Sequence, residues 1–370
     1  EFSFDMNKNH YCIIMAGGAG SRFWPMSRNA RPKQFLDILG VGRTFIQLTY
    51  DRFAKIVPVE NILIVTSEQY ADLIKEQLPD ILPENILLEP YKRNTAPCIA
   101  YATYKLFDKN PDATVVVAPS DHMITGEENF CNTISCALQH ASGSKELFTI
   151  GIKPTRPDTN YGYIQINRQT NRIINGHSSY AVKTFTEKPN EELAKVFIET
   201  GEFFWNSGIF IWNLRAIKAE LEDHLPEVAT LFAKGAGLYN TPREKDFIVK
   251  VYDNSPSISI DYGVMEKTSR AWIFLSNFGW SDVGTWNSLY DRSVDKTPEG
   301  NFIKASNTLL RGVTNSIIWE KDPEKLLVVR GLDNFMVIDE KDVLLICPHD
   351  EKVLKDILAE LAIEEQSKYL

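Results

Sequence analysis

Short apolar runs alternate with stretches of helical spacing through the first half of the chain, and this alternation constrains the fold more than any other feature. Runs typical of buried strands occur at residues 11–16, 61–66, 85–88, 113–118 and 147–150. Stretches with helical spacing lie between them, at 46–53, 71–78 and 96–107. Strands that alternate with helices predict βαβ units. We therefore expect an α/β fold with a doubly wound, mostly parallel, Rossmann-like sheet, which continues through a buried strand at 207–212.

The pattern changes after about Asp295, where helical periodicity fades. Short alternating runs follow at 308–311, 316–319, 326–330, 335–339 and 343–347. This spacing is typical of a small β domain built from short strands, and it is compatible with irregular turns of a β-helix. An amphipathic segment at 351–365 predicts a closing helix. We expect a larger domain over residues 7–295 and a small β domain with a C-terminal helix over 296–370.

The charge of the chain excludes two classes of partner. With a net charge of −9 over 370 residues, the protein repels nucleic acid and anionic membranes, so we expect neither as a partner. No apolar stretch approaches the ~18 residues of a membrane span. The N-terminus lacks the apolar core of a signal peptide, and the five cysteines form no CxxC pair. These features predict a cytoplasmic protein with reduced, buried thiols.

A glycine-rich segment, GGAGSRFWPMSR, occupies residues 17–28, directly after the first predicted strand. Glycines let the backbone approach a ligand and turn its amides inward, which suits phosphate oxygens. The segment lacks the GK[ST] of a Walker A loop, and Phe23 stands where a Rossmann dinucleotide loop has its third glycine. The residues that we expect to bind a nucleotide here are Gly17, Gly18, Ala19, Gly20 and Ser21.

A cluster of basic residues follows these glycines in an otherwise acidic chain. Its members are Arg22, Arg28, Arg31 and Lys33. Such a concentration of positive charge beside inward-facing amides suits a triphosphate and its departing pyrophosphate. The alternative is a tight strand-to-helix turn with solvated arginines.

Two aspartates are candidate ligands for a divalent cation. Asp121 follows the most apolar run in the chain, and the carboxyl end of a central parallel strand is where open α/β sheets bind ligands. Asp282 lies among glycines and tryptophans in GWSDVGTW. Mg²⁺ usually takes one or two carboxylates together with phosphate oxygens. The alternatives are a helix N-cap for Asp121 and a turn residue for Asp282.

The glycine-rich segment, followed by PKQF at residues 32–35, resembles the signature of the nucleoside-diphosphate-sugar pyrophosphorylases. Its FWPMSR form resembles the mannose-1-phosphate guanylyltransferase branch of that family. The resemblance implies that residues 7–295 form a nucleotidyltransferase catalytic domain. By this resemblance, the residues that contact the nucleotide phosphates are Arg22 and Lys33, and the ligands of Mg²⁺ are Asp121 and Asp282.

Further strings follow in the order of the same family: YGYI from residue 161, EKP from 187, WNSGIF from 205 and SIDYGVME from 259. Gly162 offers a backbone amide beside a sugar, and Glu187 and Asn206 can accept hydrogen bonds from hydroxyl groups. Lys188 supplies a compact positive charge for the 1-phosphate, and we count it among the catalytic residues. Each signal is weak alone, because a Glu-Lys pair is usually a solvated surface, so the prediction depends on their common order.

The segment EPYKRNTAP at residues 89–97 lies between a predicted strand and a predicted helix. Guanine presents N1–H and N2–H₂ donors beside the O6 acceptor, so a reader needs both an acceptor and a donor. Glu89 provides the acceptor, and we expect Asn94 and Thr95 to contact the nucleotide as well. The alternative is a surface ion pair between Glu89 and Arg93, with Asn94 as a helix cap.

The reaction that the resemblance implies is transfer of GMP from GTP to mannose 1-phosphate, with Mg²⁺ as cofactor and GDP-mannose and pyrophosphate as products. The attacking phosphate is already anionic near neutral pH, because its second pKa is about 6, so a general base is not required. A different sugar 1-phosphate or nucleotide is the nearer alternative. A non-catalytic regulatory subunit that binds nucleotide sugars is the more distant one. We also expect a homodimer, with the β segment serving either packing or subunit contact.

Overall fold

The computed structural model describes residues 6–18, 21–363 and 366–370. The chain forms two compact units. Unit 1 contains the described residues up to Gly17 together with Ile46–Ser281, and unit 2 contains the described residues of Gly18–Phe45 and Asp282–Leu370. The chain therefore passes from one unit to the other at three places.

This division differs from the expected boundary at residue 295, because aromatic packing joins distant segments within unit 2. The ring of Trp286 lies edge-on to Phe23, with 5.2 Å between centroids, and edge-on to Trp319 at 5.4 Å. Its indole N–H donates to the carbonyl oxygen of Trp24 at 3.1 Å. These long-range contacts bring the basic arm of the glycine-rich segment together with the β strands, which spacing along the sequence does not reveal.

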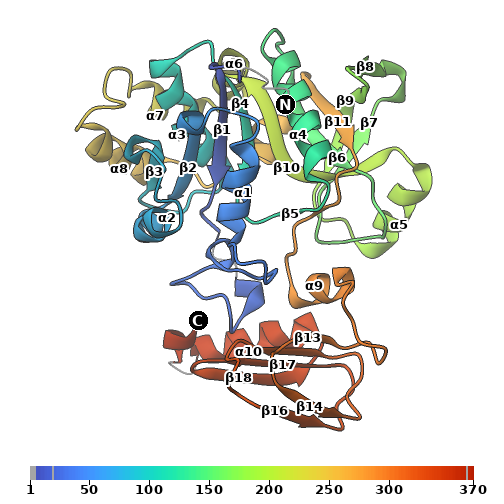
Figure 1. Ribbon diagram of the computed structural model, residues 1–370. Coiled ribbons are helices and arrows are strands. Elements are labelled where there is room, and N and C mark those ends of the chain that lie inside the picture. The colour runs from blue at the N-terminus through green and yellow to red at the C-terminus, as the bar shows by residue number, and fades with distance from the viewer. Residues whose placement is uncertain (1–5, 19–20, 364–365) are drawn as a thin grey trace. The chain divides into compact units, whose positions relative to one another are not determined.

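Unit 1 is built on a large sheet with the strand order β3-β2-β1-β4-β10-β6-β11-β9-β7, and β8 pairs with β9 (Figure 1). The strands are β1 (His10–Met15), β2 (Ile62–Ser67), β3 (Ile86–Glu89), β4 (Thr114–Pro119), β6 (Leu147–Ile152), β7 (Tyr163–Ile166), β8 (Arg172–Ile174), β9 (His177–Thr186), β10 (Phe203–Asn213) and β11 (Ala271–Ser276). A separate antiparallel pair joins β5 (Met123–Ile124) to β12 (Trp280–Ser281).

The predicted strands of unit 1 all occur, and their directions define the edge at which ligands can bind. β3, β2, β1 and β4 are parallel, and Met15 at the end of β1 lies opposite Pro119 at the end of β4. The segments that follow β1 and β4 therefore leave the sheet at the same edge. The parallel character expected for most of the sheet is confined to these strands and to the β6–β11 pair. β10 runs antiparallel to both β4 and β6, because it enters the sheet from the opposite end.

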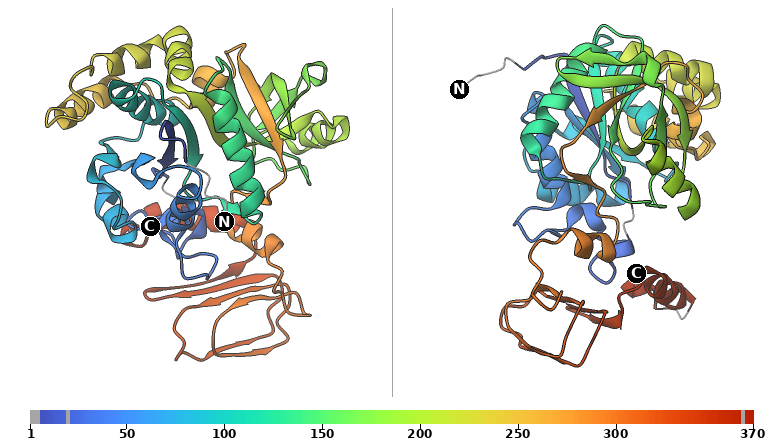
Figure 2. Two further views of the ribbon diagram at one scale, coloured as in Figure 1. Left: turned by 45° about the horizontal axis from the view of Figure 1, so that its top comes forward. Right: turned by 90° about the vertical axis from the view of Figure 1, so that its right-hand side faces the viewer.

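Helices cover both faces of this sheet (Figure 2). They are α1 (Phe45–Phe53), α2 (Ala71–Gln77), α3 (Thr95–Lys109), α4 (Glu127–Ala141), α5 (Glu191–Thr200), α6 (Leu214–His224), α7 (Pro226–Ala233) and α8 (Glu244–Asn254). Residues of α3, α6, α7 and α8 form one core with Ile13, Val115 and Trp212 of the sheet. α4 contacts β4, β6, β10 and β11. β1, β4 and β6 are buried almost throughout, as strands covered on both faces should be.

Unit 2 is a short coil of parallel strands. β13 (Phe302–Lys304), β15 (Ile317–Glu320) and β17 (Phe335–Glu340) stack in parallel, with β18 (Val343–Pro348) antiparallel at one side, and β14 (Thr308–Arg311) stacks on β16 (Leu327–Arg330). Val313, Ile318, Val329 and Val337 fill the interior. The expected C-terminal β-rich region is confirmed, and each predicted strand agrees within two residues. α9 (Trp286–Arg292) and α10 (Glu351–Ile363) complete the unit.

Several single turns of 3₁₀ helix and one turn of π helix connect these elements. They are η1 (Ser21–Phe23), η2 (Lys33–Phe35), η3 (Val59–Asn61), η4 (Glu68–Tyr70), η5 (Pro83–Asn85), η6 (Arg168–Thr170) and η8 (Ser367–Tyr369), all 3₁₀ turns, and the π turn η7 (Asp261–Met265). The π turn bears on the site, because π turns in proteins frequently occur where function requires an irregular backbone.

Candidate active site

The glycine-rich segment leaves β1 beside a buried carboxylate. A Cβ atom on Gly17 would lie 3.3 Å from Oε2 of Glu89, so only glycine lets the backbone run this close without displacing the acid. The carbonyl oxygen of Gly18 accepts a hydrogen bond from Nε2 of Gln34 at 2.9 Å. Ala19 and Gly20 lie outside the described residues, and Ser21 begins η1. The loop thus presents its backbone close to Glu89, at the predicted nucleotide site.

Unit 2 gathers the cations and one of the carboxylates that the sequence singled out. Lys33 is only 4% exposed, and its Nζ donates to the carbonyl oxygen of Asp282 at 2.5 Å. A Cβ on Gly284 would lie 2.8 Å from Oδ2 of Asp282 and 3.4 Å from a guanidinium nitrogen of Arg22. Arg22, Lys33 and Asp282 therefore meet around the turn that carries Gly284. Burying an ammonium group is costly unless anionic or carbonyl oxygens face it, and the carbonyl oxygen of Asp282 offsets part of that cost for Lys33.

Arg28 serves a different purpose from Arg22. Its guanidinium forms a two-point ion pair with Asp342, with nitrogen–oxygen distances of 2.6 and 2.8 Å. This contact joins the basic arm to the turn between β17 and β18 in unit 2. Of the arginines in the cluster, Arg28 therefore matches a structural role, whereas the exposed Arg22 remains available to a ligand.

Asp121 lies just beyond the carboxyl end of β4, and it does not cap a helix. The next helix of the described chain, α4, begins only at Glu127 with Gly126 at its N-cap, so the capping alternative for Asp121 is excluded. The neighbouring His122 accepts a hydrogen bond at Nδ1 from the indole N–H of Trp280 at 3.1 Å, which gives this histidine a structural role. Ser281 pairs with Met123 across β12 and β5.

Asp282 follows Ser281 directly in the chain and is the residue at which unit 2 resumes, whereas Asp121 belongs to unit 1. The turn alternative for Asp282 is also realised, since Val283 has a φ of 41°. A turn residue and a metal ligand are not exclusive roles. Among the described residues, no group of three or more His, Cys, Asp or Glu side chains could hold a metal. One or two carboxylates are sufficient for Mg²⁺, because phosphate oxygens and water complete its coordination.

The predicted sugar-phosphate residues come together in unit 1. A Cβ on Gly162 would lie 2.6 Å from Oε2 of Glu187 and 3.6 Å from Cβ of Asn206. The amide N–H of Asn206 donates to the carbonyl oxygen of Gly162 at 2.9 Å. Lys188 stands next to them, with a φ of 45° and its Nζ 3.9 Å from Glu187. Three segments that are distant in sequence thus form one polar group that is open to solvent at Lys188.

Asp261 belongs to this polar group, although the sequence reasoning named only the string that contains it. It begins η7, and its Oδ1 accepts a hydrogen bond from Nδ2 of Asn206 at 2.8 Å. Burial raises the pKa of Asp261, and burial followed by the nearby Asp261 raises the pKa of Glu187. The acidic string SIDYGVME was the available signal. Its spacing did not reveal which carboxylate faces inward, because a π turn shifts the usual helical periodicity.

The loop predicted to read the base has its acid buried rather than at the surface. Glu89, at the end of β3, is 7% exposed, and Oε1 accepts from the hydroxyl of Tyr252 at 2.8 Å. Burial raises the pKa of Glu89 to about 7, and the hydrogen bond from Tyr252 opposes that rise. Arg93 donates instead to the carbonyl oxygen of Tyr252 at 3.0 Å. The alternative combined a surface Glu89–Arg93 ion pair with a helix cap at Asn94. Its first part, the ion pair, is therefore wrong.

The second half of that alternative is confirmed, because Asn94 does cap α3. Its side chain accepts from the amide of Thr95 at 2.8 Å, and its φ is 66°. Thr95 in turn uses Oγ1 to accept from the amide of Ile260 at 2.9 Å. Asn94 is nevertheless exposed, so capping leaves its amide nitrogen accessible to a ligand.

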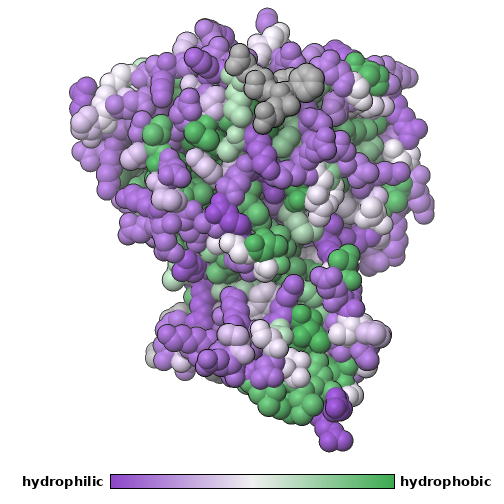
Figure 3. Space-filling model, in the orientation of Figure 1, coloured by the Kyte–Doolittle hydropathy of each residue, from purple (hydrophilic) through white to green (hydrophobic). Residues whose placement is uncertain are grey.

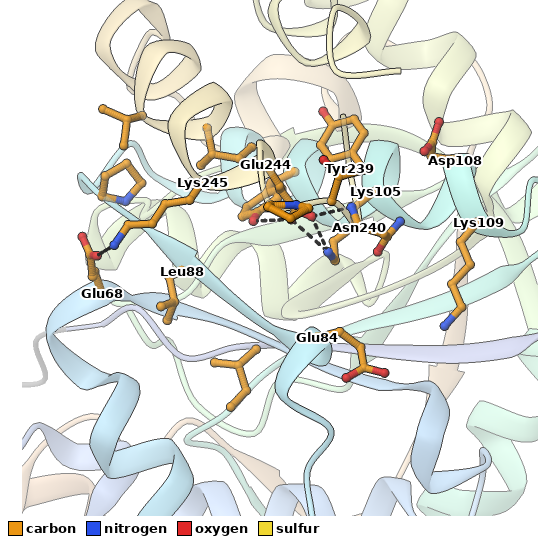
Figure 4. A pocket seen from close by; sticks show the side chains of 17 residues that line it. Glu68, Glu84, Leu88, Lys105, Asp108, Lys109, Tyr239, Asn240, Glu244 and Lys245 are labelled. Atoms are coloured by element: carbon orange, nitrogen blue, oxygen red, sulfur yellow. Dashed lines mark hydrogen bonds and ion pairs between the residues drawn. The ribbon is translucent and has the colours of Figure 1, made fainter. Parts of the chain in front are cut away.

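A hollow of about 870 Å³ lies in unit 1, between β3, α3 and α8 (Figure 4). Its centre is an ion pair between Lys105 and Glu244 at 2.7 Å. The side chains that line it include none of the predicted site residues, although Leu88 and Pro90, the neighbours of Glu89 in the chain, belong to the lining. Every helix in the described part of the chain is too short or too polar to cross a membrane.

Known proteins are similar to this chain over most of its length. Residues 11–299 match the sequence profile of the family described as "Nucleotidyl transferase". The chain belongs to the nucleotidyl transferase family.

Within the nucleotidyl transferase family, the chain is similar to proteins named mannose-1-phosphate guanylyltransferase. The protein from Sinorhizobium fredii (strain NBRC 101917 / NGR234) is 35% identical over 364 residues, which cover 96% of this chain and 69% of the relative. The protein from Salmonella montevideo is 36% identical over 369 residues, which cover 97% and 75%. A crystal structure from Thermus thermophilus, described as a mannose-1-phosphate geranyltransferase, gives a TM-score of 0.83 at 27% identity and covers 96% of this chain and 99% of its own. These relatives confirm the predicted family resemblance.

Proposed function

We propose that the chain transfers GMP from GTP to mannose 1-phosphate, releasing pyrophosphate and forming GDP-mannose. One observation carries this proposal: Arg22 and the buried Lys33 lie against the turn that contains Asp282 and Gly284. Arg22 and Lys33 belong to the segment that continues directly from the glycine-rich loop. This arrangement supplies fixed positive charge for a triphosphate and a carboxylate for a divalent cation. The named activity of the Sinorhizobium and Salmonella relatives supports the choice of substrates.

In the proposed reaction, an oxygen of mannose 1-phosphate attacks the α-phosphorus of GTP in line with the departing pyrophosphate. The new P–O bond forms as the bond from the α-phosphorus to the bridging oxygen breaks, and that oxygen keeps the electron pair. The attacking phosphate needs no base, because its second pKa is about 6. Catalysis then depends on positioning and on neutralising charge, which are the roles of Arg22, Lys33 and Lys188.

Asp121 and Asp282 are the residues that would hold Mg²⁺, although each belongs to a different unit. Both side chains offer the hard oxygen ligands that Mg²⁺ prefers. Bound Mg²⁺ would supply positive charge to the phosphate oxygens.

The polar group of Gly162, Glu187 and Asn206 is proposed to hold the sugar. Glu187 can accept hydrogen bonds from neighbouring hydroxyl groups, and Asn206 can both accept and donate. Asp261 fixes Asn206 through the hydrogen bond at 2.8 Å. Lys188 is 60% exposed at its side chain, and it is proposed to contact the 1-phosphate.

The test is a panel of nucleoside triphosphates and sugar 1-phosphates, scored by pyrophosphate release with and without Mg²⁺. We expect the highest kcat/KM for GTP with mannose 1-phosphate, and dependence on the metal. A higher value for another pair would replace the substrates but keep the chemistry. Absence of pyrophosphate release with every pair would favour the non-catalytic regulatory alternative.

We further propose that the chain forms a homodimer through an apolar face of unit 2. Figure 3 shows apolar side chains gathered at the base of this unit, and the large exposed ones include Leu309, Leu326, Val328, Leu344 and Ile346. Exposed apolar patches of this kind commonly mark interfaces between subunits. Light scattering on Leu344→Lys/Ile346→Lys should give a monomer. Val294→Lys, at a side chain that is 93% exposed elsewhere in unit 2, should leave the dimer intact.

We also propose a cytoplasmic location. The cysteines are free thiols, and Cys12, Cys98, Cys136 and Cys347 are buried. Thiols persist in reducing compartments. Fractionation of cells that express the full-length protein would test this, since recovery in an oxidising compartment would contradict it.

A further inference from the structure

One residue of α8 supports both ends of the loop proposed to read the base. Tyr252 is fully buried, and its hydroxyl donates to Oε1 of Glu89, which is 163 positions earlier, at 2.8 Å. Its backbone carbonyl oxygen accepts from Nε of Arg93 at 3.0 Å. Glu89 and Arg93 border the 89–93 loop, so Tyr252 is attached to that loop at both ends through two different groups.

The two oxygens of Glu89 face different surroundings. Oε1 is occupied by the tyrosine hydroxyl, whereas Oε2 would lie 3.3 Å from a Cβ atom on Gly17. The second oxygen therefore points to the glycine-rich segment. The carboxylate is planar. The hydrogen bond from Tyr252 to Oε1 therefore also orients Oε2 and the direction in which it can accept a hydrogen bond.

The ring of Tyr252 has a separate structural task, which the hydroxyl does not share. It lies edge-on to Phe232, with 6.0 Å between centroids, and edge-on to Tyr101 at 6.5 Å. A phenylalanine in its place would keep these contacts. It would also leave Oε1 of a buried carboxylate without this donor, which is costly for a charged group.

We propose that Tyr252 is a positioning residue for nucleotide specificity, which holds Glu89 so that its free oxygen accepts the hydrogens of guanine at N1 and N2. This inference rests on the proposed base reading by Glu89. A carboxylate that reads N2–H₂ gains from GTP an interaction that inosine triphosphate cannot make. The ratio of kcat/KM for GTP to that for inosine triphosphate therefore reports the part of the contact made at N2.

The test compares Tyr252→Phe with the wild-type protein on both nucleotides. We expect kcat/KM for GTP to fall by about ten- to a hundredfold, the range for a hydrogen bond to a charged group. The value for inosine triphosphate, which keeps N1–H but lacks N2–H₂, should fall less. The KM for mannose 1-phosphate should stay near its wild-type value. Thermal unfolding verifies that the variant is folded.

Tyr101→Phe is the matched control. Tyr101 belongs to the same aromatic cluster, and its hydroxyl also donates to a carboxylate, Oε1 of Glu244, at 2.7 Å. Figure 4 shows that Glu244 faces Lys105 in the hollow between β3, α3 and α8. This variant should keep the wild-type nucleotide ratio. An equal loss of the ratio in Tyr101→Phe would show general loosening of the core and would overturn the proposal.

The pH profile gives a readout that loose packing would not produce. The titratable groups that face Glu89 include Tyr252 from α8, and Cys98 and Tyr101 from α3. Because the tyrosine hydroxyl lowers the pKa of Glu89, its removal should move the acidic limb of kcat/KM for GTP to higher pH. An unmoved limb would contradict the proposed role.

Glu89→Gln separates this inference from the function on which it rests. If Glu89→Gln lost the nucleotide ratio and Tyr252→Phe kept it, base reading would stand and the role of Tyr252 would be overturned. If Glu89→Gln kept the ratio, base reading by Glu89 would fail, and the inference with it. If Tyr252 acts through Glu89, the double variant should lose no more than Glu89→Gln alone, and fully additive losses would count against the proposal.

Discussion

Replacing Gly162 by alanine should impair the use of mannose 1-phosphate with little effect on GTP. The new Cβ would lie 2.6 Å from Oε2 of Glu187, whereas ordinary contacts begin at 3.4 Å. The carboxylate must therefore move by about 0.8 Å, and a misplacement of about 1 Å in a site can cost a hundredfold in rate. We expect kcat/KM for mannose 1-phosphate to fall by about ten- to a hundredfold.

The stability of this variant should change little. Displacing the flexible end of Glu187 costs about 0.5–1.5 kcal/mol, while replacing a glycine restricts the unfolded chain by about 0.4–1 kcal/mol, and these effects nearly cancel. The assay is initial-rate kinetics with each substrate varied in turn, together with urea unfolding.

The matched control for this variant is Gly143→Ala, because a Cβ at Gly143 meets nothing within 4 Å. It should behave like the wild-type protein in both measurements. An unchanged KM for mannose 1-phosphate in a folded Gly162→Ala protein would show that Glu187 does not contact the sugar phosphate, and the reasoning would fail at that step.

Three further changes test other parts of the site. Asp282→Asn should reduce turnover by orders of magnitude while leaving the fold largely intact, as loss of a metal ligand implies, and near wild-type turnover at saturating Mg²⁺ would remove Asp282 from the site. Lys33→Ala should mainly impair GTP use and Lys188→Ala mainly raise the KM for mannose 1-phosphate, so equal effects on one substrate would contradict this division. Glu89 has a folded pKa of about 7, above its ordinary 4.5, so wild-type stability should fall by about 3 kcal/mol as pH rises through that interval. Glu89→Gln lacks this titration and should not show the fall, which urea unfolding at pH 5 and pH 8 would detect.

Local pattern predicted the elements of this fold well, because burial on both faces gives each central strand a continuous apolar run. β1 and β4 illustrate this, since their predicted ranges differ from the observed ones by about one residue at each end. Strand direction was not available from the same signal. The apolar residues of β10 look alike whether the strand runs parallel or antiparallel, so its antiparallel pairing with β4 and β6 required the structure.

The site residues were predicted where chemistry and motif agree at one position, as for Gly162, Glu187 and Asn206, which the structure brings together. Residues that act through another side chain were missed. Tyr252 is an ordinary aromatic of an amphipathic helix until its hydroxyl is seen on Glu89, 163 positions away. Contacts of this separation depend on the tertiary fold, and no spacing in a single sequence encodes them.

The discontinuity of unit 2 has a consequence for how the protein is made. Its first segment, Gly18–Phe45, leaves the ribosome long before its partners, since Phe23 packs on Trp286 and the indole of Trp24 bonds to the carbonyl of Tyr369, 345 positions later. At the usual 5–20 residues per second, Trp24 waits roughly 20 to 70 s for that partner. During this interval the aromatic side chains of Phe23 and Trp24 lack the partners that bury them in unit 2. Newly synthesised chains should therefore become protease-resistant in unit 1 before unit 2.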